Sequence, residues 1–310
     1  MPYHPGQPFT RTEMPSPALP SGAARLAHLG VIRAAGADAV AFLQNQLTQD
    51  VAHLPAGGTR LAAWCNPKGR MLASLWVHRR GQDELLLLLS QDLLAQTLKR
   101  LNMFVLRAKL KLTDASAEFA IHGLLGDAAS LEAPDPHTLK LALPAADGVP
   151  RALWLAPAGV PAPACPALSE DDWLLAEVRS GIARITPPMA EAFVPQMLNY
   201  ESVGGVNFKK GCYPGQEVVA RSQFRGAIKR RAFVGLVQGA AQAGQEVFDA
   251  ADPAQPVGLI AQAAPAHDGN TAVIVSIQLQ AQASAGLYIG APDGPRLGDL
   301  HLPYPLLEDV

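Results

Sequence analysis

The sequence predicts a protein of the α+β class: two related α+β units followed by a small C-terminal β-barrel. Three observations lead to this prediction. Helix-like and strand-like segments alternate in two successive blocks, in an order that favours α+β units over a doubly wound parallel sheet. Short apolar strands separated by Gly, Pro and Asp then follow at a spacing of about a dozen residues, which is typical of a small barrel or sandwich. At 310 residues, the chain is also longer than one compact core usually holds.

The first unit is predicted from one turn signal and from hydrophobic periodicity. Pro67 and Gly69 occupy the second and fourth positions of a turn, as a type I turn favours, so the flanking strands should form a hairpin. Apolar residues alternate with Arg107, Lys109 and Lys111, which is typical of a half-exposed strand. In chain order, we expect a strand at 25–33, a helix after Asp38, strands at 61–65, 71–78 and 84–89, a helix at 90–102 and a strand at 106–113.

The second unit repeats this pattern more weakly, and the barrel follows it. Ser169 with Asp172 three residues later is a variant of the capping box and predicts a helix through Arg179. The other elements expected in the second unit are a strand at 118–122, a short helix at 123–131 and strands at 138–143 and 151–156. In the barrel, strands are expected at 232–237, 246–248, 257–261, 271–279 and 287–289.

These elements divide the chain into five segments. Residues 1–22 contain six prolines and no apolar stretch of the signal-peptide kind, so we expect a flexible leader and a cytoplasmic protein. The first α+β unit is expected over 23–114 and the second over 115–228. The barrel is expected over 229–290, and a Pro-rich tail over 291–310.

The composition excludes several classes of protein. Hydrophobic residues make up 49% and charged residues 17% of the chain, so a sizeable core can form and a disordered chain is excluded. The longest apolar runs, such as Leu85–Leu89, are far shorter than the roughly 20 residues of a membrane span. The formal net charge is −2. We therefore expect neither a membrane nor duplex nucleic acid as a direct partner.

The common catalytic and metal-binding motifs are missing from the sequence. It contains no G-x-S-x-G, H-E-x-x-H or G-x-G-x-x-G pattern and no Walker lysine loop. No two histidines stand four residues apart, and Cys65, Cys165 and Cys212 form no C-x-x-C pair. No metal site is therefore predicted, and Cys65 and Cys165 are interpreted as inert thiols.

One segment combines a cysteine with strong positive charge. Residues 209–231 contain seven Lys or Arg and one acid, a net charge of +6 in a chain whose net charge is −2. Gly211 and Pro214-Gly215 predict a turn around Cys212. Basic surroundings concentrate anions and lower the pKa of a thiol. Two interpretations stay open: a reactive, exposed Cys212 beside an anion site, or a tight turn with a buried cysteine and a solvated basic face.

The segment from Phe193 to Arg221 resembles the folate-binding YgfZ-type family. Its members are relatives of the aminomethyltransferase T-protein of glycine cleavage and assist iron–sulfur proteins. The family signature K-G-C-Y-x-G-Q-E is matched in full from Lys210 through Glu217. Further similar stretches, spread over residues 24–290, are Phe42–Gln44, Gln46–Thr48, Asp50-Val51, Asn66–Arg70, Phe104–Arg107, Gly181-Ile182, Arg225-Gly226 and Lys229-Arg230. The resemblance implies a three-domain ring with a central hole.

The resemblance also implies a ligand: tetrahydrofolate, or a one-carbon derivative of it, bound in the hole. Cys212 is the implied functional thiol near the rim. The signature residues implied beside it are Lys210, Tyr213, Gln216 and Glu217.

The residues that the resemblance implies at the folate are on several elements. Trp173 matches a position where a relative has a tryptophan at the folate site, and an indole can stack on a pterin. It also fits an ordinary core position on a helix. Arg107, Lys109 and Lys111 could meet the glutamate carboxylates, although outward charges on a strand commonly serve only solvation. The residues implied for folate binding are Trp173, Arg179, Arg221 and Arg107.

Three positions depart from the pattern of the T-proteins. T-proteins carry acidic residues, one of them the catalytic aspartate, in the strand after the N-x-x-G turn, where this chain has Ala73 and Ser74. They also carry a pterin-anchoring glutamate just before the helix-ending glycine, where this chain has Arg179, with Glu177 two residues earlier. Leu29 replaces an aromatic residue of a relative. These departures argue against aminomethyl transfer, which needs the carboxylate.

Taken together, the resemblance implies a tetrahydrofolate-binding protein that helps to assemble or repair iron–sulfur clusters through Cys212. Its partners would be iron–sulfur client proteins or cluster-assembly proteins, and it would thereby support cluster-dependent enzymes such as tRNA-modifying ones. Two alternatives remain: a folate-dependent aminomethyltransferase of the T-protein type, and a ligand-free scaffold for a cluster enzyme. Methylene transfer from glycine to folate would favour the first, and an apolar central cavity would favour the second.

Overall fold

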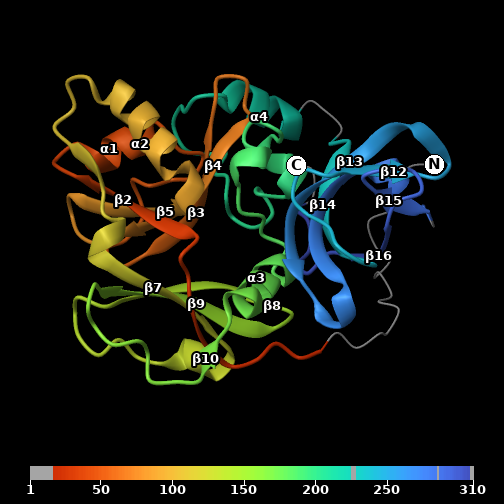
Figure 1. Cartoon of the computed structure of the whole chain (residues 1–310). Coiled ribbons are helices and arrows are strands. Elements are labelled where there is room, and N and C mark those ends of the chain that lie inside the picture. The colour runs from red at the N-terminus through yellow and green to blue at the C-terminus, as the bar shows by residue number, and fades with distance from the viewer. Residues whose placement is uncertain (1–16, 225–227, 285, 308–310) are drawn as a thin grey trace.

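A computed structural model describes residues 17–224, 228–284 and 286–307. Over these residues the chain forms two five-stranded sheets and one closed barrel, so the predicted α+β class with a C-terminal barrel is confirmed. The three bodies surround a common centre, with the first sheet at the upper left of Figure 1, the second below it and the barrel at the right. Residues 1–16, which make up most of the predicted leader, and Arg225-Gly226 lie outside the described residues.

The first sheet lies between two helices and the second sheet. Residues Leu85, Leu87 and Leu89 pack beneath the helices, whereas Leu86 and Leu88 face the core shared with the second sheet. Burial on both faces explains why this strand is a continuous leucine run and does not alternate with polar residues. Across the sheet, the strands are β3 (Thr59–Cys65), β4 (Met71–Arg79), β5 (Glu84–Ser90), β2 (Leu29–Ala35) and β6 (Lys111–Asp114), and the helices are α1 (Ala39–Gln44) and α2 (Gln91–Val105).

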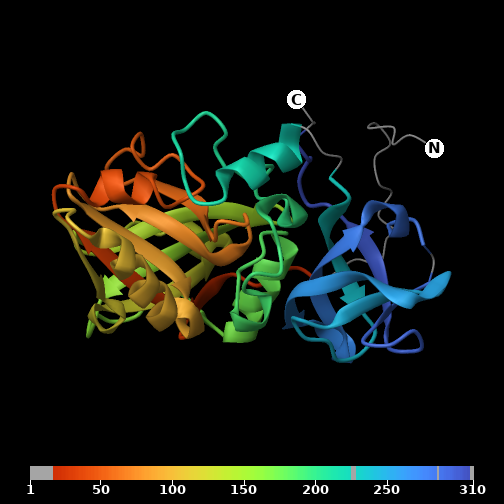
Figure 2. The same ribbon diagram turned by 90° about the horizontal axis from the view of Figure 1, so that it is seen from above.

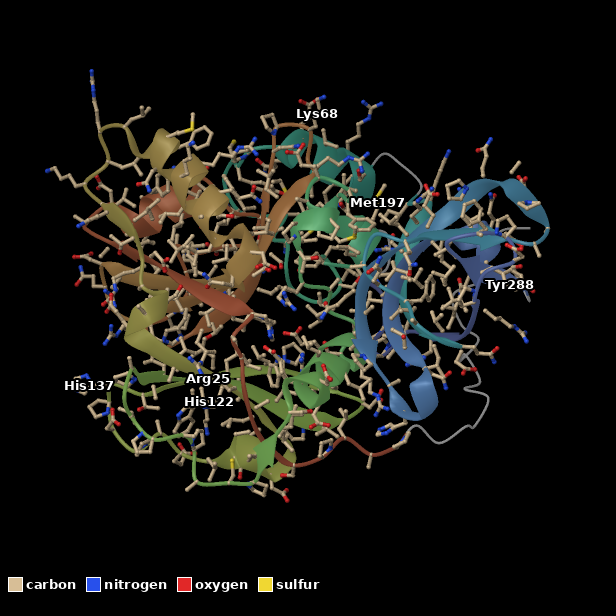
Figure 3. The ribbon with its side chains drawn as sticks, viewed as in Figure 1. Arg25, Lys68, His122, His137, Met197 and Tyr288 are labelled. Atoms are coloured by element: carbon tan, nitrogen blue, oxygen red, sulfur yellow. The ribbon has the colours of Figure 1, made fainter. Side chains whose placement is uncertain are left out.

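The second sheet is completed by a strand from the beginning of the chain. Across this sheet, the strands are β10 (Ala167–Leu168), β1 (Gly22–Arg25), β7 (Phe119–Leu125), β9 (Val149–Pro157) and β8 (Leu139–Ala146). Arg25 and His122, which are paired across β1 and β7, lie together on this sheet in Figure 3. Helix α3 (Glu170–Arg179) follows, and its predicted capping box is confirmed, since Ser169 Oγ and the Asp172 carboxylate each accept a backbone N–H from the other residue.

The strand predicted at 25–33 is wrong as a single element. It is two strands in two sheets: β1 pairs with β7 and β10, and β2 pairs with β5 and β6. Leu26 is buried between them, so the apolar pattern continues while the chain crosses from one sheet to the other. The proposed domain boundaries stay predictions, but this crossing ties the first predicted unit to the second.

Two other local predictions in these units are also wrong. Helix α2 continues through Val105, and of the predicted strand at 106–113 only residues 111–113 lie in a strand, β6. Leu106 has a positive φ of 42° and is 89% exposed, so the alternation there reflects a turn and not a strand face. The short helix predicted at 123–131 is the end of β7 followed by a 3₁₀ turn at Gly126–Ser130.

The barrel extends beyond its predicted end. Its strands, in order around the barrel, are β11 (Arg230–Val237), β14 (Thr271–Gln278), β13 (Asp252–Pro265), β12 (Glu246–Asp249), β15 (Leu287–Ile289) and β16 (Arg296–His301). The prediction of a Pro-rich tail over 291–310 is therefore wrong, because β16 pairs with both β11 and β15 and closes the barrel. Prolines at 295 and 303 flank this strand without interrupting it, which disguises it in the sequence.

Helix α3 and the long segment after it lie between the sheets and the barrel. Figure 2 shows α3 in the middle of the molecule, and Gln262 of β13 donates a hydrogen bond to Glu177 of α3. The segment then leads to helix α4 (Gln216–Phe224). The remaining 3₁₀ turns are Ser116–Glu118, Pro187–Met189, Pro195–Leu198, His267–Gly269 and Leu279–Ala281.

Candidate functional site

A cavity lies where the two sheets meet α3 and the segment after it. Its volume is about 30 Å³, which is room for an ordered water. The cavity also opens toward solvent. Its lining residues are Leu29, Leu61, Ser74, Leu75, Trp76, Leu88, Leu89, Leu143, Arg151, Leu153, Trp173, Glu177, Ile182, Ala183, Arg184 and Tyr200.

Most of this wall is apolar, but three charged side chains reach it. Arg151 comes from β9, Glu177 from α3 and Arg184 from the segment after α3. Two guanidinium groups and one carboxylate give the cavity a net positive charge. Such a site, with apolar walls and a few polar groups, suits a planar ligand that carries acceptor oxygens.

Glu177 is held in place by several donors. Its Oε1 accepts a hydrogen bond from Nε1 of Trp173 at 3.1 Å, and its Oε2 accepts from Nε2 of Gln262 at 2.9 Å. Nε of Arg184 lies 3.4 Å from Oε2, and Nε2 of His28 lies 3.8 Å from Oε1. Burial alone would raise the pKa of Glu177, but Arg184, His28 and Arg151 together hold this pKa well below its usual range. The carboxylate is therefore ionised, and both of its oxygens have partners within the protein.

Trp173 is at the cavity wall, as the resemblance implies, but its ring is fully covered. The side chain is 0% exposed. A Cβ atom on Gly123 would meet the indole at 2.2 Å, so the β7 backbone packs directly on the ring. The guanidinium carbon of Arg151 lies over the ring, 5.5 Å from its centroid. In this conformation a pterin finds no free indole face on which to stack, which differs from the expectation.

Arg151 was not predicted from the sequence, and it is the least expected residue of the cavity. Its exposed fraction is only 4%, and its Nε donates to the carbonyl of Pro144 at 3.0 Å. Burial lowers its pKa to about 10, while the nearby Glu177 opposes this shift. The available signal was a lone arginine before the apolar run Ala152–Ala156 in a strand.

The structure also shows what stands at the positions that depart from the T-proteins. Ala73 is fully buried. Ser74 lines the cavity, where its Oγ accepts a hydrogen bond from the backbone N–H of Ile185 at 2.8 Å. Leu29 also lines the cavity. At these three positions, therefore, the cavity meets no acidic side chain.

The signature segment lies on the first sheet's outer end, away from the cavity lining. Gly215 packs against the β3–β4 turn, where an added Cβ would meet the carbonyl oxygen of Asn66 at 2.5 Å. Val218 of α4 contacts Gly69 of the same turn, and Lys68 at its tip lies at the top of Figure 3. The backbone N–H of Asn207 donates to the carbonyl of Thr48 at 2.9 Å.

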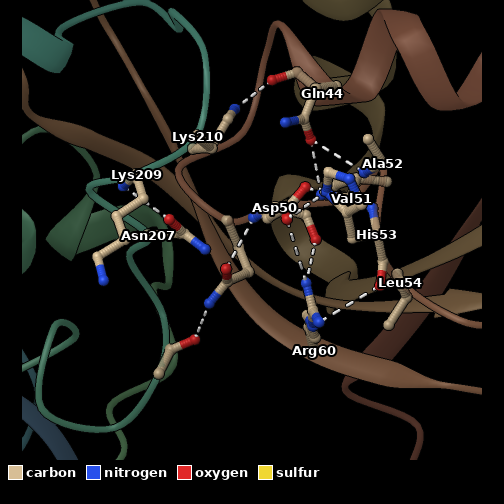
Figure 4. Close-up of polar contacts among 12 residues, drawn as sticks. Gln44, Asp50, Val51, Ala52, His53, Leu54, Arg60, Asn207, Lys209 and Lys210 are labelled. Atoms are coloured by element: carbon tan, nitrogen blue, oxygen red, sulfur yellow. Dashed lines mark hydrogen bonds and ion pairs between the residues drawn. The ribbon is translucent and has the colours of Figure 1, made fainter.

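Lys210 anchors this segment to the end of α1. It is buried, and its Nζ donates to the carbonyl of Gln44 (Figure 4). It also donates to the carbonyl of Leu47 at 2.7 Å. Cations at a helix C-terminus satisfy the free carbonyls there. Burial lowers the pKa of Lys210 to about 8, although Asp50 and Cys212 act in the opposite direction. The geometry gives Lys210 a structural task beside the thiol.

The other signature residues differ in exposure. Tyr213 is buried, with Nζ of Lys210 5.0 Å from its ring centroid, and burial raises the pKa of its hydroxyl well above its usual range. Cys212 is exposed, as are Glu217 and Arg221, and Gln216 is half-buried. None of these residues lines the cavity.

The other residues singled out in the sequence neither line the cavity nor belong to the signature segment. Arg107 is exposed on the turn after α2 and does not line the cavity. Arg179 is buried on the far side of α3, where Nη1 donates to the carbonyl of Pro17 at 2.7 Å and Nε lies 3.8 Å from Asp147. Cys65 is buried, and burial raises its pKa to about 12, whereas Cys165 is partly exposed.

Lys210→Met is expected to change how stability depends on pH. Because the pKa of Lys210 is about 8 in the folded protein and 10.5 in its ordinary state, the unfolded chain binds more protons between these values. The wild-type free energy of unfolding should therefore rise with pH over this interval, relative to the variant, by on the order of 2 kcal/mol. Urea unfolding below, within and above the interval measures it. The exposed Lys209→Met is the control, and parallel pH curves for wild type and Lys210→Met would contradict the expectation.

Comparisons with known proteins agree with this fold. Residues 20–131 match the family model described as the GCVT N-terminal domain. The crystal structure of the glycine cleavage system aminomethyltransferase T from Bartonella henselae superposes with a TM-score of 0.68, covering 90% of this chain and 85% of that chain at 13% identity. The chain is therefore a protein of the aminomethyltransferase-like fold.

The family is narrower than the fold. The tRNA-modifying protein YgfZ of Edwardsiella ictaluri is 31% identical over 256 residues, covering 75% of this chain and 74% of that protein. The tRNA-modifying protein YgfZ of Serratia proteamaculans is 28% identical and covers 100% of this chain and 98% of that protein. The chain belongs to the YgfZ family.

Two kinds of feature are missing from the described part of the chain. No helix among residues 17–224, 228–284 and 286–307 is long and apolar enough to cross a membrane. Within the same residues, no three His, Cys, Asp or Glu side chains gather in a way that could hold a metal ion.

Proposed function

We propose that this protein binds tetrahydrofolate in the central cavity and assists the assembly or repair of iron–sulfur clusters through Cys212. The observation that carries the proposal is the cavity itself, with apolar walls and the charged groups of Arg151, Glu177 and Arg184. The names of the relatives, tRNA-modifying proteins, fit a protein that supports cluster-dependent tRNA-modifying enzymes.

The residues present fit a folate in chemistry. Leucines from both sheets offer apolar surface to a planar ring, and the charged groups of the wall would meet its polar atoms. The ring of Trp173 is buried and packs against the guanidinium of Arg151, so Trp173 would hold Arg151 in place and would not stack on the ligand. Bound there, tetrahydrofolate would supply a carrier for a one-carbon unit. The chain's own side chains would bind and orient it and exclude water.

The thiol would act at a second place. Cys212 is exposed on a segment that Lys210 and Gly215 fasten to the first sheet, so a partner protein can reach it. The basic residues of 209–231 favour a partner with an acidic surface. Iron–sulfur client proteins and cluster-assembly proteins are the proposed partners.

A folate-dependent aminomethyltransferase is less well supported. The fold is shared, but Ala73 and Ser74 offer no carboxylate, and Glu177 is engaged by Trp173, Arg184 and Gln262. A ligand-free scaffold is also less well supported, because the cavity carries charged groups that an apolar void would not need.

Calorimetric titration with tetrahydrofolate tests the proposal. We expect wild type to bind with a Kd in the micromolar range, and Trp173→Ala to weaken binding at least tenfold, about 1.4 kcal/mol, because Arg151 loses the ring it rests on. Trp173→Phe, which retains an aromatic ring in the core, controls for misfolding and should bind more tightly than the alanine variant. Absence of binding by folded wild type would remove folate from the proposed function.

A further inference from the structure

Arg151 occupies a position where a charge is costly. It directly precedes an apolar stretch of β9, the strand next to the edge strand β8 of the second sheet, and is 96% buried. A buried charge is normally paired, because its hydration is lost. Arg151 forms no ion pair among the described residues, so its presence at this buried position needs an explanation.

The contacts of Arg151 leave its donors unused. Nε donates to the carbonyl of Pro144, and the guanidinium rests over Trp173. Among the described residues, Nε is the only nitrogen of the guanidinium that makes a hydrogen bond. Glu177 is near, but its oxygens accept from Trp173, Arg184 and Gln262. The side chain is therefore fixed at one nitrogen and has free donors at the cavity wall.

The charges of the cavity point in the same direction. Glu177 forms its ion pair with Arg184 and acts on Arg151 only from farther away, so two guanidinium groups share one carboxylate and the lining keeps a net positive charge. A guanidinium presents paired donors that match a carbonyl or carboxylate oxygen. An incoming ligand with such an oxygen would complete the pairing, whereas a cationic group would be repelled.

We propose that Arg151 is a ligand-binding residue of the central cavity and that its terminal nitrogens receive an acceptor oxygen of the ligand. This inference rests on the proposed function, in which the ligand is a tetrahydrofolate. The oxygen belongs either to the pterin head, as a carbonyl or formyl group, or to the glutamate tail, as a carboxylate. Trp173 then serves as a positioning residue that holds the guanidinium.

The test is titration of wild type and Arg151→Gln with tetrahydrofolate. We expect the variant to bind at least tenfold more weakly. Arg33→Gln is the matched control, because Arg33 pairs with Glu84 and Glu118 away from the cavity and its loss should leave the Kd unchanged. Arg151→Lys keeps the charge without the planar fork and should lie between wild type and Arg151→Gln. Circular dichroism establishes that each variant is folded.

Two further probes identify the source of the oxygen. If Arg151 binds the pterin head, a tetrahydropterin without a tail should bind Arg151→Gln more weakly than wild type. If Arg151 binds the glutamate tail, p-aminobenzoylglutamate should bind Arg151→Gln more weakly than wild type. Wild type and Arg151→Gln binding tetrahydrofolate within twofold of each other would overturn this inference and leave the proposed function standing. Failure of wild type to bind any of the three compounds would overturn both.

Discussion

Glu177→Gln is expected to lower the free energy of unfolding by about 3–5 kcal/mol at neutral pH, the typical cost of removing one partner of a buried ion pair. The substitution keeps the shape of the side chain but leaves Arg184 without its counter-charge, 3.4 Å away, and increases the uncompensated charge around Arg151. The measurement is guanidinium unfolding, in which the transition that reports the two sheets should move to lower denaturant.

The same change should alter the response to acid. The pKa of Glu177 is lowered by folding, so its contribution to stability is present above its ordinary pKa of 4.5 and is lost as the pH falls below that value. Wild type and Glu177→Gln should therefore converge in stability in acid and diverge toward neutral pH. Glu170→Gln is the control: its side chain is 40% exposed and contacts His28 at 2.6 Å, so its effect should stay below about 1 kcal/mol. Equal stability of wild type and Glu177→Gln at neutral pH would show that the carboxylate is not needed.

Cys212→Ser is expected to abolish the support of iron–sulfur enzymes while leaving the fold and the ligand site intact. The thiol is exposed, so the change should alter stability by no more than about 0.5 kcal/mol. It lies outside the cavity lining, so the Kd for tetrahydrofolate should be that of wild type. The measurement is the activity of a cluster-dependent tRNA-modifying enzyme in cells that carry only the variant.

The matched control is Cys165→Ser, which removes a partly exposed thiol that packs against residues of the second sheet. It should support the enzyme fully. A folded Cys212→Ser protein that binds folate and restores full enzyme activity would refute the role of the thiol. Loss of folate binding in this variant would instead show that the signature segment and the cavity are coupled.

Features set by neighbouring residues could be predicted from the sequence. The turn at Pro67 and Gly69 and the capping box of Ser169 depend on contacts within a few residues, and both are present. The signature around Cys212 could be found because its residues are consecutive. Its place on the first sheet could not, because that place depends on carbonyls of Gln44 and Leu47 far back in the chain.

Features that depend on distant pairing were missed. The apolar pattern around Leu26 is the same whether the chain stays in one sheet or crosses to another, since both sides are buried. Leu106 and its neighbours alternate by chance in a turn. Arg151 and Glu177 line the same cavity only because the second sheet packs against α3, so their shared position could not be inferred from their spacing in the sequence. The same packing places Arg151 over the ring of Trp173, which could not be inferred either.

The crossing between the two sheets has a consequence for synthesis on the ribosome. All strands of the first sheet lie between Leu29 and Asp114, so they are complete once that stretch has emerged. Strand β1 is synthesised before the first sheet, but it can pair with β7 only after β7 has been synthesised. It can pair with β10 only when Ala167, the partner of Ala23, has emerged. Strand β1 is therefore unpaired while the first sheet is already complete. A pause in translation before Ala167 would prolong this state, in which the nascent chain can aggregate through the unpaired strand.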